Sequence, residues 1–103
     1  MSAGKPDFTE VGRHAEEAAA LLRALAHEGR LKVLCDLIGG ERSVGELVKT
    51  SGLSQSALSQ HLARLREESI VETRRDGQTI YYRLGDPHVA RVLDTLHELY
   101  CRK

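Results

Sequence analysis

Residues 43–84 read SVGELVKTSGLSQSALSQHLARLREESIVETRRDGQTIYYRL, and they carry the strongest structural signals in the chain. Ser43 followed by Glu46 is a capping box, which opens a short helix that closes at Ser51-Gly52. Ser54 then caps a second helix, because its hydroxyl is free to accept a first-turn backbone N–H. Two helices joined by a tight Ser-Gly-Leu turn are typical of a helix-turn-helix unit.

The second helix of this pair, residues 55–68, is the predicted reading helix. At about 100° per residue Leu58, Leu62 and Leu65 share one face, which predicts that this face packs on the core. The opposite face carries small hydroxyls and amides, which reach bases and phosphates in the major groove without steric bulk. A solvated polar face is the alternative interpretation. The residues expected to contact DNA from this helix and its cap are Ser54, Gln55, Ser56, Ser59, Gln60, His61 and Arg64.

After Ser69 the pattern changes from helix to hairpin. Residues 70–75 and 79–84 are rich in β-branched and aromatic side chains, which predicts two strands. Asp76-Gly77 between them predicts a two-residue turn. Arg74 and Arg75 stand at the end of this hairpin, where we expect them to contact flanking phosphates. The hairpin would then be the wing of a winged helix-turn-helix.

Helices are expected on both sides of this unit. Residues 11–26 are rich in Ala, Leu and Glu and predict the first helix. A second helix begins near Glu28 and ends at Gly39-Gly40. Asp86-Pro87 predicts the start of a last helix that continues to the end of the chain. The expected fold class is therefore mainly α with a small β-hairpin wing, in the order α-α-α-α-β-β-α.

Length and composition fit one small domain. The chain has 103 residues, of which 41% are hydrophobic, so a single winged-helix DNA-binding domain is expected over residues 1–103, with residues 1–8 flexible. The longest apolar run, residues 18–22, is too short to span a membrane, and no secretion signal is recognisable. We therefore expect a cytoplasmic protein without a membrane partner.

The 15 basic residues balance 15 acidic ones, so DNA affinity must come from the arrangement of charges rather than from their sum.

The outer helices carry more apolar side chains than so small a core needs. The surplus lies in the first and last helices, at Leu21, Leu22, Leu25, Val89, Val92, Leu96 and Leu99. This pattern predicts a homodimer whose two reading helices are about 34 Å apart, one turn of DNA.

Two segments, LRALAHEGRLKVLCDL at residues 22–37 and residues 43–84 quoted above, resemble the ArsR/SmtB family of winged-helix repressors. The resemblance covers about residues 16–102. It implies a homodimer built from the first and last helices, which binds an imperfect palindromic operator in double-stranded DNA and releases it in response to an effector.

His61 falls where the family commonly has a histidine. Its place at the edge of the buried face favours an orienting or phosphate-contacting role. Ser69 stands where the family usually has glycine, because the chain leaves the helix there in a left-handed conformation.

The resemblance makes a metal-sensing repressor one alternative. One metal site of the family uses Cys-x-Cys in the third helix, but residues 43–47 contain no thiol. Another begins with Asp-x-His at the start of the last helix, which Asp86 and His88 match. Its further ligands lie eleven and fourteen residues after the histidine, where this chain has Leu99 and Arg102, and neither side chain ligates zinc. No metal site and no cofactor are therefore expected.

Cys35 and Cys101 lie in the second and last helices, as in the dithiol persulfide-sensing branch of the family, the group that contains BigR, SqrR and HlyU. This resemblance implies that reactive sulfur species join the two thiols of one protomer through a polysulfide bridge, after which DNA is released. Lys32 and His97 are expected to favour the thiolate forms. Two alternatives remain open. The thiols are chemically inert, or the repressor senses peroxide or disulfide through them.

An enzyme is not expected from the remaining polar residues. His61 lies near Ser56 and Ser59 only because of helical spacing, and no acid orients it, so these residues do not form a catalytic triad. The two cysteines form no CxxC motif, which excludes a zinc ribbon and a thioredoxin-type site.

Overall fold

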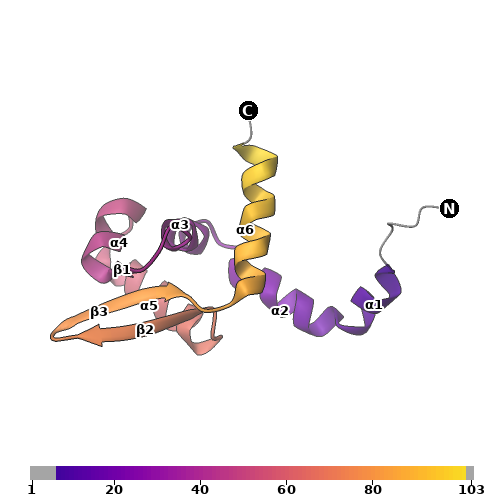
Figure 1. The fold of residues 1–103 in the computed structure, drawn as a ribbon, viewed down its shortest axis with the longest axis horizontal. Coiled ribbons are helices and arrows are strands. Elements are labelled where there is room, and N and C mark those ends of the chain that lie inside the picture. The colour runs from indigo at the N-terminus through magenta and orange to yellow at the C-terminus, as the bar shows by residue number, and fades with distance from the viewer. Residues whose placement is uncertain (1–6, 102–103) are drawn as a thin grey trace.

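Six helices and a small antiparallel sheet make up the computed structural model, which describes residues 7–101 (Figure 1). In chain order the elements are α1 (Phe8–Arg13), α2 (Ala15–Leu25), α3 (Glu28–Leu37), β1 (Arg42–Ser43), α4 (Val44–Ser51), α5 (Gln55–Glu67), β2 (Val71–Asp76), β3 (Thr79–Leu84) and α6 (Pro87–Tyr100). The hairpin β2–β3 extends to one end of the molecule and α1 to the other (Figure 1). The predicted winged helix-turn-helix, mainly helical with a small β wing, is confirmed.

The first predicted helix is wrong in one respect, because residues 11–26 do not form a continuous helix. His14 leaves helical geometry with φ −109° and ψ 24°, and it separates α1 from α2. Gly12, a weak helix former, lies just before the break, and the imidazole of His14 contacts Glu17 at 2.8 Å. Within the segment expected to be flexible, Asp7 caps α1 by accepting the Thr9 N–H. Phe8 begins α1, and residues 1–6 of that segment lie outside the described residues.

The core lies where α3, α4, α5 and the first half of α6 meet the sheet. Leu58, Leu62 and Leu65 of α5 are buried, as their spacing predicted. They pack with Leu34, Leu47 and other aliphatic side chains in one cluster. Each leucine removed from water contributes about 1.5–3 kcal/mol. This cluster therefore fixes α5 so that its polar face points outward.

The sheet has a strand that the sequence patterns did not reveal. β1 pairs with β3, which also pairs with β2, in the order β1-β3-β2. The predicted turn was displaced by one residue: Asp76 pairs with Thr79, so the two loop residues are Gly77 and Gln78. Gly77 has φ +64° whereas Gln78 has no positive φ, and a positive φ at the first central position alone is the pattern of a type II′ turn.

The C-terminus of α5 is a Schellman motif, in which the chain reverses through a left-handed residue. Ser69 has φ +61°, as the resemblance implied for this position. The Ser69 N–H donates to the carbonyl of Arg66 at 3.0 Å, and the Ile70 N–H donates to that of Leu65 at 2.9 Å. Ile70 and Leu65 are both buried, so this turn fixes the wing relative to the reading helix.

The last helix, α6, rises from the body of the molecule (Figure 1). Its first half is anchored by the buried Val89 and Leu93, whereas Leu99 and Tyr100 near its end are 67% and 81% exposed. Leu22 on α2 is also exposed. Among residues 7–101 no helix is both long and apolar enough to cross a membrane.

Candidate DNA-binding surface and thiol pocket

The polar face of α5 is open to solvent. Gly52, with φ +74°, ends α4, and Ser54 caps α5 by accepting the Ala57 N–H at 3.1 Å. Ser54 is therefore engaged as a helix cap, whereas the other small polar groups project from the first turns. Arg64 lies further along and pairs with Glu68 at 3.1 Å. The exposed members of the predicted set on α5 are Gln55, Ser56, Ser59, Gln60 and Arg64.

His61 differs from the other predicted contacts of α5, because it is only partly exposed and packs against α3. Its ring centroid lies 4.6 Å from that of His27, with an angle of 54° between the rings. Burial lowers the pKa of His61, and the nearby His27 and Arg30 lower it further. This placement agrees with an orienting role rather than with base contact.

The two arginines of the wing have different surroundings. The guanidinium of Arg74 donates to both carboxylate oxygens of Glu41, at 2.8–3.2 Å, and lies 4.6 Å from the centre of the Tyr81 ring. This hydrogen bonding lowers the pKa of Glu41. Arg75 is exposed and donates to the Gly77 carbonyl at 3.2 Å. Sequence reasoning missed Glu41, because only the pairing of β1 with β3 brings it near the wing.

The two cysteines line one pocket of about 440 Å³ between α3 and α6. Cys35 lies in α3, and Cys101 is the C-cap residue of α6, with its N–H donating to the His97 carbonyl at 2.8 Å. Both are free thiols and exposed to solvent. The other lining residues are Ile38, Leu93, Asp94, Leu96, His97 and Tyr100. The fold thus places thiols that are far apart in sequence around one largely apolar hollow.

The electrostatics of Cys35 differ from the sequence expectation. Burial raises the pKa of the Cys35 thiol, and the negative charges of Asp36 and of a Cys101 thiolate raise it further. Lys32, which we expected to favour the thiolate, instead pairs with Glu28 at 3.3 Å. The expectation that Cys35 has a lowered pKa is therefore wrong. A protonated thiol is a poor nucleophile, so the raised pKa makes Cys35 less nucleophilic than an ordinary thiol at neutral pH.

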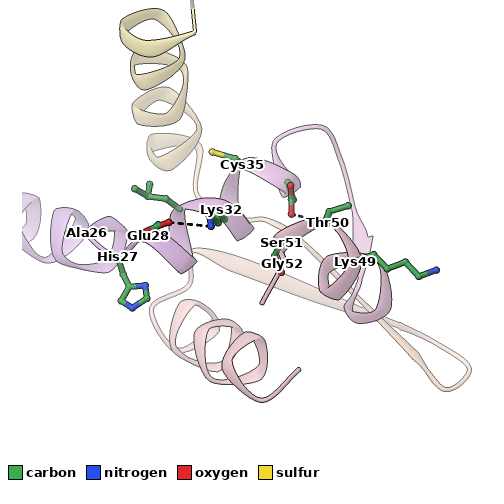
Figure 2. A pocket seen from close by; sticks show the side chains of 11 residues that line it. Ala26, His27, Glu28, Lys32, Cys35, Lys49, Thr50, Ser51 and Gly52 are labelled. Atoms are coloured by element: carbon green, nitrogen blue, oxygen red, sulfur yellow. Dashed lines mark hydrogen bonds and ion pairs between the residues drawn. The ribbon is translucent and has the colours of Figure 1, made fainter. Parts of the chain in front are cut away.

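Cys35 also borders a second and larger hollow, the α3–α4 groove, of about 820 Å³. Figure 2 shows its lining residues on α3 and at the end of α4, with Cys35 on the side of α3 that faces α6. Across the groove, the hydroxyl of Thr50 donates to Asp36 at 2.7 Å. The Cys35 side chain is therefore accessible to a small molecule in either hollow.

A sequence profile for the bacterial regulatory protein, arsR family, matches residues 27–73. The transcriptional activator HlyU of Vibrio cholerae is 47% identical over 96 residues, which cover 93% of this chain and 89% of that protein. The chain belongs to the ArsR family. Its members are DNA-binding transcriptional regulators, so the predicted family and the regulatory function are confirmed.

Solved structures of ArsR-family proteins share the fold. Reduced HlyU from V. cholerae superimposes with a TM-score of 0.83 at 48% identity, covering 89% of this chain and 97% of that one. The transcriptional repressor BigR from Xylella fastidiosa gives 0.90 at 41% identity, covering 95% and 100%. The DNA-binding domain Mb0332 from Mycobacterium bovis, described as a homodimeric winged helix-turn-helix, gives 0.74 at 31% identity, covering 95% and 89%.

The ArsR-type metal positions hold other interactions in this chain. Asp86 caps α6 by accepting the His88 N–H at 2.8 Å, and its carboxylate lies 3.4 Å from the His88 ring. Among residues 7–101 no three His, Cys, Asp or Glu side chains lie close enough together to hold a metal ion.

Proposed function

We propose that this protein is a homodimeric ArsR-family repressor, which binds its operator through α5 and the wing and releases it when reactive sulfur joins Cys35 to Cys101. The observation that carries the proposal is that both thiols line one pocket. Cys35 lies on α3, which packs on the reading helix, and Cys101 ends the helix that carries the exposed apolar end. A bond between them therefore links the DNA-reading part of the protomer to the part expected to dimerise.

The proposed reaction consumes sulfane sulfur. Each thiolate attacks the outer sulfur of a low-molecular-weight persulfide, RSSH, and releases RSH, which leaves a persulfide on the protein. The terminal sulfur of the Cys101 persulfide then attacks the sulfur of Cys35 and expels HS⁻. Two molecules of RSSH thus yield one trisulfide bridge, two molecules of RSH and one of H2S. A third donor adds a fourth sulfur to the bridge in the same way.

The pocket favours such a bridge over a direct disulfide. A direct bond needs Cα atoms within about 7 Å, and each inserted sulfur adds up to about 2 Å of reach. The 440 Å³ hollow leaves room for added sulfur between two helices that are packed on a common core. Peroxide brings no sulfur, so its sulfenic acid must be resolved by a direct bond between the two Sγ atoms, without inserted sulfur to extend the reach.

The deciding experiment pairs mass spectrometry with DNA binding. Reduced protein is treated with a persulfide, with peroxide or with glutathione disulfide, and titrated with its operator. We expect persulfide to give an intramolecular Cys35–Cys101 link with extra sulfur and to weaken binding at least tenfold, about 1.4 kcal/mol. Cys35→Ser and Cys101→Ser should each abolish this response and leave reduced-state affinity unchanged. Release of DNA by a single mutant would refute the dithiol mechanism. An equal response to peroxide would favour the redox-sensing alternative.

In this proposal α5 enters the DNA major groove and the wing contacts phosphates, which predicts different effects on specific and general DNA contacts. Gln60→Ala should weaken operator binding by about 1–3 kcal/mol and leave random-sequence DNA unaffected, because an amide reads a base edge. Arg75→Ala should weaken binding to both DNAs and reduce the salt dependence, because a guanidinium contacts phosphate. Titrations of both duplexes at two or more salt concentrations test this. Equal effects of the two substitutions on both duplexes would show that the assignment is wrong.

The dimer is supported by exposed apolar side chains on the outer helices. Leu22, Leu99 and Tyr100 are at least half exposed in the single chain. We expect sedimentation to show a dimer at micromolar concentration and Leu99→Glu to weaken it, since a charge would be buried in the interface. A monomeric wild-type protein under these conditions would contradict the proposed assembly.

A further inference from the structure

Two histidines join α3 to the reading helix, α5. His27 is the N-cap residue of α3, where its Nδ1 accepts the Gly29 N–H at 3.0 Å. Its ring packs on that of His61 from α5, with 4.6 Å between centroids. Gly29 is buried beneath them, and a methyl group there would lie 2.8 Å from Nε2 of His61. Figure 2 shows His27 on the opposite side of α3 from Cys35.

This arrangement requires neutral rings. The Nδ1 atom of His27 accepts a hydrogen bond only when it carries no proton. Two imidazolium rings at this distance would also repel each other, and burial of His61 would penalise its charge. Protonation of either ring therefore opposes the contact between α3 and α5.

The charged groups around the pair do not offset this penalty. On α3, Arg30 donates to the carbonyls of Ala24 and Arg23 at the end of α2, which places a further cation beside His61. Glu28 follows His27, but its carboxylate pairs with Lys32 at 3.3 Å. On α5, Arg64 is paired with Glu68.

We propose that His27 and His61 are a positioning pair that holds α5 on α3 when both rings are neutral, so that DNA binding weakens when the pair takes up a proton. The DNA-bound form then carries fewer protons than the form in which α5 has shifted, and acid favours the latter. The expected loss of DNA affinity at low pH is the opposite of the usual effect, because protonated histidines otherwise strengthen DNA binding by adding positive charge. This role does not depend on the thiols.

The test measures affinity as a function of pH with the reduced full-length protein. The probe is a 30-base-pair duplex selected from a random library by the wild-type protein at pH 7.5. At constant ionic strength we expect the Kd of the wild type to rise at least about fivefold between pH 7.5 and 5.5, since each coupled proton can supply about tenfold per unit of pKa difference. In His27→Asn the rise should be clearly smaller, because asparagine still caps the helix but does not titrate, which leaves only the burial penalty on His61. His61→Gln should behave in the same way.

The matched control is His88→Gln, which alters a histidine whose side chain is 78% exposed and should keep the wild-type profile. Circular dichroism at each pH separates displacement of α5 from global unfolding. NMR titration of the imidazoles gives a readout without DNA: His61 should titrate below the ordinary histidine range, and its midpoint should rise in His27→Asn. The proposal is overturned if the wild-type Kd is constant or falls toward pH 5.5, if His27→Asn keeps the full wild-type rise, or if the His61 midpoint is the same in His27→Asn as in the wild type.

Discussion

Replacing Ser69 by glycine should stabilise the protein. Ser69 adopts φ +61°, a conformation in which the Cβ of an L-residue is crowded and glycine has no such penalty. The side chain is exposed, so its removal loses no buried contact. Both backbone hydrogen bonds of the Schellman motif are kept in the variant. We expect a gain of about 0.5–1 kcal/mol in the free energy of unfolding. This is the backbone strain that is relieved in the folded state, minus the stabilisation that glycine gives to the unfolded chain through its greater conformational entropy.

For a domain of this size 1 kcal/mol shifts Tm by roughly 4–8 °C, so Ser69→Gly should raise Tm by about 2–8 °C. Thermal unfolding followed by circular dichroism measures this, at one fixed protein concentration because a dimer's Tm depends on concentration. Ser69→Ala is the matched control, since it removes the hydroxyl but keeps the Cβ, and it should melt close to the wild type. An unchanged or lower Tm for Ser69→Gly, or an equal rise for Ser69→Ala, would refute the argument from backbone strain.

Three further changes test other parts of the structure. Glu41→Gln removes the carboxylate that pairs with Arg74, and it should strengthen binding to random-sequence DNA severalfold in a titration at low salt; unchanged affinity would mean that the pair does not compete with phosphate. Because the pKa of the Cys35 thiol is raised, its alkylation by iodoacetamide should reach half-maximal rate above the pH typical of thiols, and Asp36→Asn should lower that pH; the same midpoint in both proteins would exclude the aspartate as a cause. Leu34→Ala should cost about 2–5 kcal/mol in chemical unfolding, since its side chain is fully buried, and a loss below 1 kcal/mol would contradict the assigned core.

The features that sequence reasoning predicted are those set by neighbours along the chain. The caps at Ser43, Ser54 and Asp86 are local hydrogen bonds, and the apolar spacing of α5 depends only on helical period. What it missed depends on distant segments. β1 exists because β3 pairs with it, and Glu41 becomes a partner of the wing only through that pairing.

The thiol site was predicted from a resemblance and not from the residues themselves. No local pattern shows that Cys35 and Cys101 line one pocket, because that depends on the way α6 packs against α3. The effect expected of Lys32 failed for a local reason. Glu28 lies one helical turn before Lys32, and the i,i+4 ion pair between them, at 3.3 Å, engages the ammonium group.

The position of Cys35 between two hollows bears on how a bridge can close. Displacement at sulfur proceeds in line, so the leaving group departs from the side opposite the attacking sulfur. In the proposed reaction the attack comes from the pocket that Cys35 shares with Cys101, and the α3–α4 groove borders Cys35 as well. Hydrosulfide therefore has a second hollow beside Cys35 into which it can leave, besides the pocket from which the attack comes. Narrowing the groove would slow bridge closure while leaving the first transfer of sulfur to each thiol unaffected.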